Sequence, residues 1–159
     1  MPTTPPAATT IRPAVPGDGD TLIEFNLRMA SETEGLSLDP STLARGVRAA
    51  LSDPAKALYF VADLGGKVVG QLMLTREWSD WRDGDIWWIQ SVYVHADHRR
   101  RGVFRALYEH ARRRARAAGV VGLRLYVERH NAAAQDVYRS LGMKDAGYLV
   151  MEQPIERAR

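Results

Sequence analysis

Three consecutive arginines followed by a glycine form the part of the sequence best suited to hold an anion. Arg99, Arg100, Arg101 and Gly102 lie between an apolar run, predicted as a strand, and an amphipathic run, predicted as a helix. A glycine at such a turn lets the backbone approach a ligand closely. The first turn of the helix offers N–H groups without intrahelical partners, at the positive end of the dipole. The stretch therefore predicts a phosphate or pyrophosphate site, with arginines to neutralise the charge.

A second candidate site is formed by an asparagine and a tyrosine further along the chain. Asn131 and Tyr138 are seven residues apart, so they share one face of the helix predicted there. A tyrosine that points into a cleft can donate a proton to a leaving group. The alternative is a tyrosine with its ring in the core and its hydroxyl at the rim.

Several common classes of phosphate-binding and metal-binding protein are excluded. The sequence has no Gly-x-x-x-x-Gly-Lys-Ser/Thr motif and no Gly-x-Gly-x-x-Gly motif after a strand, so the predicted phosphate site is neither a P-loop nor a dinucleotide site. It contains no cysteine, which rules out disulfides, thiolate metal sites and cysteine nucleophiles.

The elements that must position these residues alternate between strands and helices. Short apolar runs bounded by turn signals predict strands over residues 10–15, 57–62, 68–75, 86–94, 122–127 and 146–151. Apolar residues at helical spacing, with capping residues, predict helices over residues 20–31, 40–52, 103–118 and 132–140. Residues 31–35 and 77–85 are interpreted as acidic loops, and Pro13 places the first strand at an edge.

This order of elements predicts a single-domain α/β fold with a mixed sheet and about four flanking helices. The strands over residues 57–62 and 68–75 form an antiparallel hairpin. The strands over residues 86–94 and 122–127 are separated by a helix, so they form a central parallel pair. Residues 1–9 are rich in proline and threonine and predict a disordered leader, so the domain is expected over residues 10–159.

Charge and hydropathy limit the partners of the protein. The net charge is +3, and eight arginines lie between residues 99 and 116. Such a local excess favours one anionic ligand site, or a solvated helix face, over a DNA-coating surface. No apolar run approaches the roughly 20 residues of a membrane span, and no signal-peptide pattern is visible. We therefore expect a cytoplasmic location.

Together, the two motifs resemble those of the GNAT superfamily of acyl-CoA-dependent N-acyltransferases. Residues 99–104 are similar to the family's Gln/Arg-x-x-Gly-x-Gly/Ala loop. The family's Asn-x-x-Ala-x-x-x-Tyr-x-x-x-Gly-Phe pattern is matched by Asn131, Ala134, Tyr138, Gly142 and Met143. The resemblance covers about residues 10–151. It implies transfer of an acetyl group from acetyl-CoA to a primary amine of a small molecule or peptide, by direct attack in a ternary complex and without a metal.

The resemblance also implies a role for each matching residue. Backbone groups of Val92 and Val94, on either side of Tyr93, would pair with the pantetheine arm as another strand would. Asn131 would bind the pantetheine or position its helix, and Tyr138 would protonate the departing thiolate. The pyrophosphate would be held by one loop, made of Arg99, Arg100, Arg101, Gly102, Val103, Phe104 and Arg105.

Two positions depart from the family pattern. Phe104 stands where a second small residue is expected, so its ring must point away from the phosphates and into the core. Gln90 stands where many members carry a glutamate base. It cannot accept a proton at neutral pH, but it can hold a water that relays the proton. Glu32 and Glu34 rank first as acceptors of that proton, because the loop expected to carry them overhangs the acceptor site in this family. The other candidates are Glu77, Asp80 and His95, and for each of the five a solvated surface residue is the alternative.

Two further functions are compatible with the sequence. A non-catalytic acyl-CoA-binding module of the same fold is favoured by Gln90 and Phe104 and disfavoured by Tyr138. A nucleic-acid binder would use the basic residues 98–101 and 112–116, but the aromatic residues that such binders interleave with charge lie elsewhere. We therefore expect no nucleic-acid partner and no membrane. The acidic loops favour a small cationic amine as acceptor, and a homodimer is compatible with the family.

Overall fold

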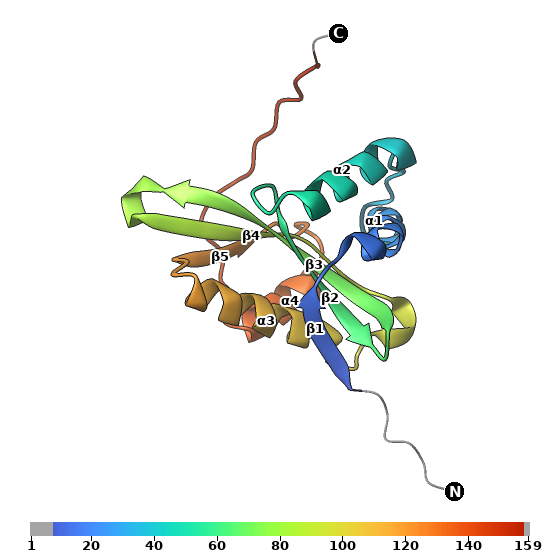
Figure 1. Cartoon of the computed structure of the whole chain (residues 1–159). Coiled ribbons are helices and arrows are strands. Elements are labelled where there is room, and N and C mark those ends of the chain that lie inside the picture. Colours follow the sequence, from blue (N-terminus) through green and yellow to red (C-terminus); the bar gives the residue numbers. More distant parts are fainter. Residues whose placement is uncertain (1–7, 158–159) are drawn as a thin grey trace, which may run out of the picture. The chain divides into compact units, whose positions relative to one another are not determined.

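The computed structural model describes residues 8–157, over which the chain forms a five-stranded sheet and four α-helices (Figure 1). The elements in chain order are β1 (Thr9–Pro13), α1 (Gly19–Glu34), α2 (Pro40–Ser52), β2 (Leu58–Leu64), β3 (Lys67–Ser79), β4 (Gly84–Val94), α3 (Val103–Ala117), β5 (Gly122–Leu125) and α4 (Ala132–Ser140). These residues divide into two compact units, one that ends at Tyr126 and one that begins at Val127. The predicted leader lies mostly outside the described residues.

The sheet belongs to the first unit and has the strand order β1-β2-β3-β4-β5. Neighbouring strands are antiparallel from β1 to β4. The last pair is parallel and joins Ile86–Ile89 of β4 to Gly122–Leu125 of β5. The predicted α/β class, the antiparallel hairpin, the parallel pair and the edge position of the first strand are therefore confirmed.

Helices cover both faces of this sheet. Tyr59 and Val61 of β2 pack in one cluster with Leu22 of α1 and Val47 of α2. Phe60 lies between them in sequence and must face the other way, because side chains alternate along a strand. Its ring contacts His110 of α3 edge-on, with centroids 4.7 Å apart. Hence α1 and α2 lie on one face and α3 on the other.

Two predicted loops are in fact the ends of regular elements. The predicted acidic loop over residues 31–35 is wrong, because α1 continues through Glu34 and is ended by Gly35, which has a left-handed φ of 62°. The second predicted loop, over residues 77–85, is too long, because only residues 80–83 lie between the two strands. Here β3 runs to Ser79 and β4 begins at Gly84, and cross-strand pairing continues to the tip of the hairpin.

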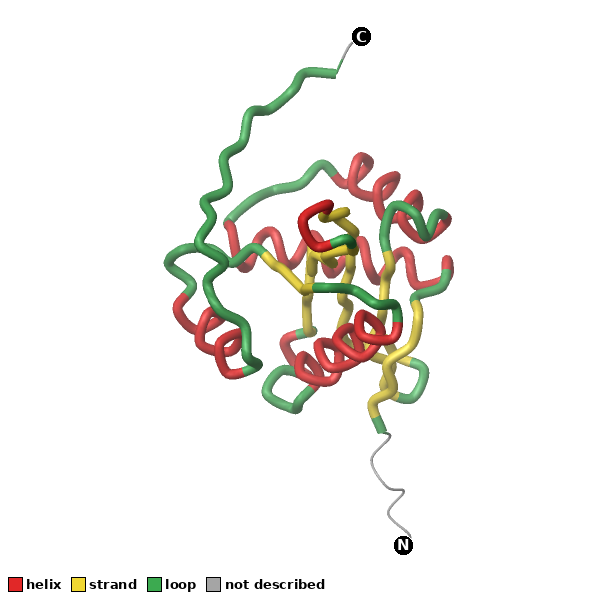
Figure 2. Tube along the Cα trace, turned by 90° about the vertical axis from the view of Figure 1, so that its left-hand side faces the viewer, coloured by secondary structure: helices red, strands yellow, loops and turns green. Residues whose placement is uncertain are grey.

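The strand predicted over residues 146–151 is absent. No strand in residues 8–157 follows α4, and Figure 2 draws the whole of this segment as loop. The apolar sequence of residues 148–151 favours a strand, but a strand needs a hydrogen-bonded neighbour and the described sheet ends at β5.

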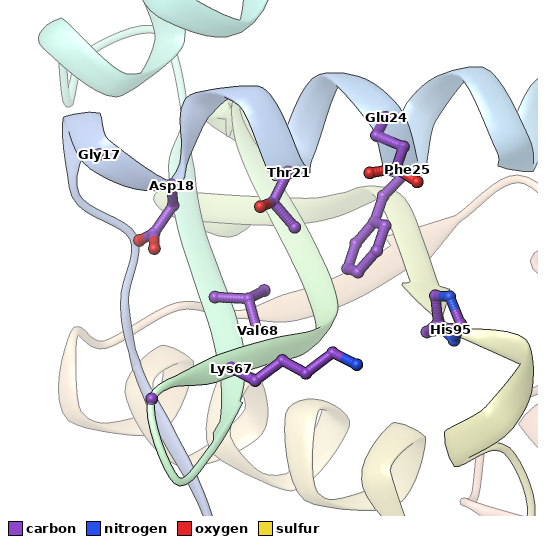
Figure 3. A pocket seen from close by; sticks show the side chains of 9 residues that line it. Gly17, Asp18, Thr21, Glu24, Phe25, Lys67, Val68 and His95 are labelled. Carbon is purple, nitrogen blue, oxygen red and sulfur yellow. The ribbon is translucent and has the colours of Figure 1, made fainter.

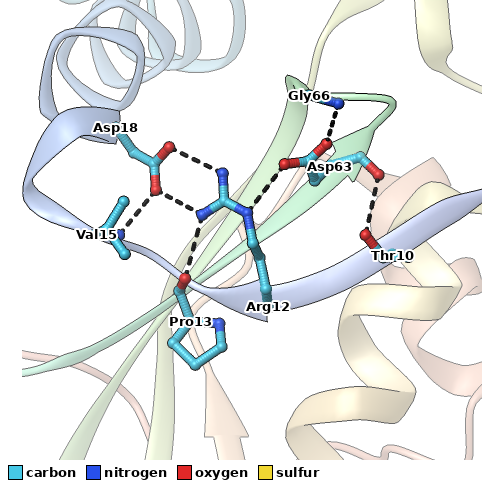
Figure 4. A network of polar contacts seen from close by, with 7 residues as sticks. All are labelled: Thr10, Arg12, Pro13, Val15, Asp18, Asp63 and Gly66. Atoms are coloured by element: carbon cyan, nitrogen blue, oxygen red, sulfur yellow. Dashed lines mark hydrogen bonds and ion pairs between the residues drawn. The ribbon is translucent and has the colours of Figure 1, made fainter.

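A partly buried ion pair ties β1 to the start of α1 and to β2 (Figure 4). The Arg12 guanidinium donates to both carboxylate oxygens of Asp18, at 2.8 and 3.0 Å, and to Asp63 at 3.0 Å. Asp18 also accepts the N–H of Val15 at 2.8 Å. The hydrogen bonds from Arg12 lower the pKa of the Asp18 carboxyl, and the same contacts raise the pKa of Arg12. Both charges are therefore fixed at neutral pH.

None of the helices within residues 8–157 combines the length and apolar character that a membrane crossing requires. The same residues contain no group of three or more histidine, aspartate or glutamate side chains placed to hold a metal ion.

Candidate functional site

The candidate site begins where β4 continues beyond its parallel neighbour. The pairing of β4 with β5 stops at Ile89, whereas β4 itself runs on to Val94. The register of β3 against β4 shifts at the same point, since Met73 pairs with Ser91 and Leu74 with Ile89. Gln90 is therefore the extra residue of a β-bulge, which bends a strand and ends regular pairing. Beyond the bulge, one edge of β4 has no strand partner among the described residues.

Main-chain groups at this open edge can bind an extended ligand. The amide of His95 donates to the carbonyl of Val69 on β3 at 2.9 Å. Because main-chain groups alternate in direction along a strand, the N–H and C=O groups of Val94 and Val92 point away from β3, to the open edge. Those of Tyr93 point towards β3, and its ring packs on Phe25 of α1 with centroids 5.2 Å apart. The predicted strand-like contacts thus fit Val92 and Val94, and not the backbone of Tyr93.

The chain after β4 folds into a cradle of N–H groups. A short 3-10 turn (Ala96–His98) leads into Arg100 and Gly102, which both have left-handed φ values, 60° and 80°. No side chain caps α3, and its first helical bond runs from Ala106 N to the carbonyl of Gly102 at 3.0 Å. The N–H groups of residues 103–105 therefore lack intrahelical partners. Arg100, Arg101 and Arg105 are exposed around them, as an anion site requires.

Gly70 of β3 sets the position of this cradle. A Cβ atom at Gly70 would lie 3.2 Å from Val103 and 3.3 Å from Leu107 of α3, and 3.1 Å from the carbonyl oxygen of Tyr93. The missing side chain thus lets the first turns of α3 rest directly on the sheet. Sequence reasoning overlooked Gly70, although a lone glycine inside an apolar strand is a signal of close approach.

Phe104 is accommodated along α3. Its ring is half-buried and stacks on that of Tyr108, one turn further along the helix, with centroids 6.4 Å apart. The bulky side chain therefore packs beside the helix, and its backbone N–H remains at the helix start.

Arg99 joins three parts of the site in what we call the Arg99 cluster (Glu32, Tyr93, Val94 and Arg99). Its Nε donates to the carbonyl of Val94 at 2.9 Å, and its Nη2 lies 2.5 Å from Oε2 of Glu32 at the end of α1. The Tyr93 hydroxyl donates to the other Glu32 oxygen at 2.9 Å. The guanidinium carbon of Arg99 lies 5.3 Å from the centre of the Tyr93 ring. The arginine loop is thus tied both to β4 and to α1.

These contacts shift the protonation of the cluster. The hydrogen bond from Arg99 is the main reason that the pKa of Glu32 is lowered. The pKa of Tyr93 is raised, first by burial and then by its bond to Glu32. At neutral pH Glu32 is therefore an anion and Tyr93 a neutral donor.

Gln90, predicted to hold a relaying water, and the other predicted proton acceptors make separate contacts. The amide nitrogen of Gln90 donates to the hydroxyl of Thr75 at 2.9 Å, which leaves the exposed amide oxygen beside the bulge. Glu34 forms no ion pair within residues 8–157. The remaining candidates have their own contacts: Glu77 with Arg124, Asp80 with the N–H of Trp81, and His95 with Arg28.

Two buried polar side chains beside the bulge have no hydrogen-bond partner within the described residues. They are Gln71 of β3, fully buried, and Ser91 of β4, 9% exposed. Gln71 pairs with Tyr93 across the strands, and Ser91 pairs with Met73. Both side chains therefore lie on the face covered by α1 and α2. Buried polar groups are normally paired or bind an ordered water. Sequence reasoning overlooked both residues, although a glutamine within an apolar strand was a usable signal.

Asn131 and Tyr138 belong to the second unit, where they lie on α4. The side chain of Asn131 caps that helix by accepting the N–H of Ala134 at 3.1 Å. Tyr138 is half-buried, and burial raises the pKa of its hydroxyl. The tyrosine therefore keeps its proton at neutral pH, as a proton donor must.

A polar cavity of about 480 Å³ lies in the first unit, between the start of α1 and the turn from β2 to β3. Figure 3 shows Thr21, Glu24 and Phe25 of α1 above Lys67 and Val68 of β3, with His95 at one end. None of the residues that we assign to the open edge or the N–H cradle lines this cavity.

The chain is similar to known acetyltransferases in sequence and in structure. A model of the Acetyltransferase (GNAT) family matches residues 24–143. The structure of a possible acetyltransferase from Clostridium difficile 630 has 43% sequence identity and a TM-score of 0.88, over 94% of this chain and 99% of that chain. No curated protein matches the sequence.

More distant structures share the fold alone. One is a ribosomal-protein-alanine N-acetyltransferase from Brucella melitensis biovar Abortus 2308, with 18% identity and a TM-score of 0.73 over 93% of this chain and 100% of that chain. Another is the aminoglycoside acetyltransferase meta-AAC0020 from an uncultured soil metagenomic sample, in complex with sisomicin. It has 19% identity and a TM-score of 0.72 over 94% of this chain and 97% of that chain.

Proposed function

The chain belongs to the acetyltransferase (GNAT) family, and from this we propose that it transfers an acetyl group from acetyl-CoA to a primary amine. The acceptor is a small cationic molecule or a peptide N-terminus, and the amine attacks directly in a ternary complex. One observation carries the proposal: the open edge of β4 leads straight into the N–H cradle at the start of α3. An extended arm that ends in a pyrophosphate needs these two features in this order.

The residues present fit acetyl-CoA as co-substrate. The outward main-chain groups of Val92 and Val94 match the amides of pantetheine. The N–H groups of residues 103–105, together with Arg100, Arg101 and Arg105, match the pyrophosphate. Arg99 contacts Glu32 and the carbonyl of Val94, so we assign it to shaping the loop.

The chemistry forms a C–N bond and breaks the C–S bond of the thioester. The neutral amine attacks the carbonyl carbon and loses one proton, and the sulfur leaves and gains one. An N–H at the open edge near Val92 stabilises the charge that develops on the carbonyl oxygen. Tyr138, whose hydroxyl keeps its proton, donates to the departing sulfur. Asn131 supports this step by starting the helix that carries Tyr138.

The proton of the amine leaves through a carboxylate or a water. The exposed amide oxygen of Gln90 holds the amine or a relaying water beside the bulge. Glu34, which has no competing ion pair in the described part of the chain, is the better proton acceptor of the two glutamates at the end of α1. Glu32 acts through Arg99 and Tyr93, because its lowered pKa makes it a weak base.

The acceptor is expected to be cationic. Glu32 and Glu34 lie on the last turn of α1, and Glu32 contacts Tyr93 and Arg99 beside the open edge of β4, so this side of the approach is acidic. Such a rim attracts amines that are protonated in solution. The distant structural relatives act on a ribosomal-protein alanine and an aminoglycoside, which define two classes of amine to test.

The test is release of free thiol from acetyl-CoA over a panel of polyamines, aminoglycosides, amino acids and peptides with free N-termini. We expect amine-dependent thiol release, with the acetylated amine seen by mass spectrometry. Heat of acetyl-CoA binding by calorimetry, without thiol release for any amine, would instead identify a non-catalytic acyl-CoA-binding module. Neither heat nor thiol would reject the site itself.

A further inference from the structure

The polar cavity between the start of α1 and the turn from β2 to β3 has no part in the proposed reaction. Its volume of about 480 Å³ lies within the range of small-molecule sites. Its lining combines apolar and charged side chains from α1, from the start of β3 and from the end of β4 (Figure 3). Every lining residue belongs to the first unit, so that unit alone forms the cavity.

One end of the cavity presents hydrogen-bond donors that lack an acceptor. The ammonium group of Lys67 has no ion pair or hydrogen bond within the described part of the chain, and Figure 3 shows it directed towards the ring of His95. The Nδ1 atom of His95 accepts the N–H of Asp97 at 3.3 Å, so the neutral ring carries its proton on Nε2. Nε2 then faces another donor, Nη1 of Arg28, at 3.3 Å. An anion at this end would accept hydrogen bonds from these groups.

The side of the cavity formed by α1 offers acceptors. One oxygen of Glu24 accepts a hydrogen bond from Arg28, and its second oxygen has no partner among residues 8–157. The hydroxyl of Thr21 also has no partner in this range. Asp18 adds no free charge, because Arg12 binds both of its carboxylate oxygens. A ligand ammonium group would therefore be bound on this side.

We propose that this cavity binds a free α-amino acid and that its occupancy changes the affinity for acetyl-CoA. An α-amino acid carries a carboxylate and an ammonium group on one carbon atom. This pair matches the donors of Lys67 and His95 beside the acceptors on α1. Phe25 and Val68 supply apolar contacts for the rest of the ligand. A simple anion or a simple amine would use only half of these groups.

An aromatic contact links the cavity to the proposed acetyl-CoA site. The centre of the Phe25 ring lies 6.2 Å from that of His95, in the cavity, and 5.2 Å from that of Tyr93. The Tyr93 hydroxyl donates to Glu32, which holds Arg99 beside the N–H cradle. A ligand that moves Phe25 therefore acts on the Arg99 cluster as well. This coupling rests on the proposed function, whereas amino-acid binding does not require it.

A titration followed by proton–nitrogen correlation spectra of the full chain tests binding at this place. The probes are the common L-α-amino acids, each added up to about 10 mM, which detects a Kd in the millimolar range. We expect at least one of them to shift the amides of Thr21, Gly66 and His95. Its N-acetylated form, which has no ammonium group, should bind about tenfold more weakly or less. Absence of shifts at these amides with every probe would overturn the proposal. Shifts confined to the open edge of β4 would also overturn it, because they would identify an acceptor only.

Two variants test the residues that define the ligand. Lys67→Gln and Glu24→Gln are each expected to weaken binding of that amino acid about tenfold, as the loss of a hydrogen bond to a charged group does. Lys67→Arg, which keeps the charge, should restore part of the affinity. Lys56→Gln is the matched control, because Lys56 pairs with Asp53 on the surface. The spectra show whether each variant is folded. Unchanged binding in both glutamine variants would refute the site.

Calorimetry with acetyl-CoA, in the presence and absence of the same amino acid, tests the coupling. We expect the Kd for acetyl-CoA to change about fivefold or more, and the Kd for the amino acid to change by the same factor when acetyl-CoA is bound. An unchanged Kd for acetyl-CoA would refute the regulatory role. Failure of acetyl-CoA to bind at all would reject the acetyl-CoA site and with it the coupling, but not amino-acid binding.

Discussion

At the scale of single residues, the organising feature is the arginine that reaches back from the cradle to α1. Arg99 is one of three arginines that the sequence presents as equivalent. The structure separates them, because Arg99 contacts Glu32, Tyr93 and the carbonyl of Val94, whereas Arg100 and Arg101 stay exposed. A sequence motif gives the positions of such residues, but only the fold brings a glutamate 67 residues away to one of them.

Replacing Glu32 by glutamine tests its part as a positioning residue. The variant loses the ion pair with Arg99, so the loop that forms the cradle is held less firmly. We expect the KM for acetyl-CoA to rise about 3- to 10-fold, the equivalent of about 0.7–1.4 kcal/mol, which is the net contribution of one ordinary hydrogen bond. Because the pKa of Glu32 is lowered from its ordinary value of 4.5, its charge is constant above that pH. The pH profile of kcat between neutral and alkaline pH is therefore expected to remain unchanged.

The matched control for this experiment is Glu34→Gln, on the same turn of α1. If Glu34 accepts the proton of the amine, its replacement lowers kcat and alters the pH profile. Should Glu32→Gln abolish the acidic limb of the kcat profile, Glu32 is the base and the positioning role is refuted.

Tyr138→Phe tests the proton donor. Removing the hydroxyl is expected to lower kcat by about 100-fold, the lower part of the range for general acids, with little change in the KM for acetyl-CoA. Since burial raises the pKa of Tyr138 above its ordinary value of 10, the natural enzyme should show no loss of rate from this group below that pH. Steady-state thiol release across the pH range measures both effects. An unchanged kcat in the phenylalanine variant would contradict the assignment.

At the scale of elements, the sequence was informative wherever one local signal decides the structure. Asp39 and Pro40 predicted the start of α2, and the Asp39 side chain does accept the N–H of Thr42 at 2.9 Å. The parallel pair followed from one strand–helix–strand pattern. The end of α1 and the tip of the β3–β4 hairpin were not predicted correctly from the sequence, because their acidic residues are typical of loops. What decides these ends is a cap at Gly35 and the pairing of two long strands.

The candidate site also combines features that the sequence predicts with features that it does not. The cradle was predictable, because arginines, a glycine and a helix start are adjacent in the chain. The bulge at Gln90, the close approach at Gly70 and the unpartnered Gln71 and Ser91 depend on contacts between strands. Those contacts are set by register, which the sequence of one strand does not reveal.

Gly102→Val tests the geometry of the cradle. The φ of Gly102 is 80°, a left-handed value that a β-branched residue adopts only under strain of about 1–3 kcal/mol. We expect weaker acetyl-CoA binding by calorimetry, together with a lower melting temperature. The control is Gly46→Ala in α2, where a Cβ meets no atom within 4 Å. That change should stabilise the helix by about 0.5–1 kcal/mol and leave binding intact. Unchanged binding in Gly102→Val would argue against the cradle.

Asp18→Asn tests the ion pair that fastens β1. Asp18 is 8% exposed and its pKa is lowered below 3.8, chiefly by Arg12. A carboxyl whose pKa is lower in the folded state than in the unfolded state stabilises the folded protein at pH values above its unfolded-state pKa. That contribution is lost as the pH falls through the folded-state pKa. We expect the variant to be less stable by about 1–2 kcal/mol at pH 7, with the difference shrinking below pH 3.8.

Chemical denaturation at several pH values measures this difference. Asp20→Asn is the control, because Asp20 is exposed and lies 3.4 Å from Arg48 on the surface. Exposed ion pairs contribute little to stability, so this variant should resemble the natural sequence. Equal stabilities of Asp18→Asn and the natural sequence at pH 7 would contradict the assigned role.

At the scale of the whole molecule, charge is unevenly distributed. The net charge of +3 conceals eight arginines between residues 99 and 116 and acidic residues at the end of α1 and at the hairpin tip. One region therefore attracts phosphates and another attracts amines, which suits two substrates of opposite charge.

The salt dependence of the two KM values tests whether charge attracts acetyl-CoA and the amine. Raising the ionic strength shortens the Debye length from about 10 Å at 0.1 M to 3 Å at 1 M. We expect the KM values for acetyl-CoA and for a polycationic amine to rise together with salt, while kcat changes little. A KM for acetyl-CoA that is independent of salt would show that the exposed arginines do not contribute to its binding.

The β3–β4 hairpin gives the molecule an intrinsic optical reporter. All four tryptophans of the chain lie on β3, on β4 or on the turn between them. Trp87 is 4% exposed, whereas Trp78 is 63% and Trp81 is 91% exposed. Tryptophan fluorescence of this protein therefore comes from one hairpin, with a buried emitter on the bulged strand β4 and exposed emitters near the acidic tip. Quenching by a soluble agent separates the two groups, so a substrate at either end is detectable without a label.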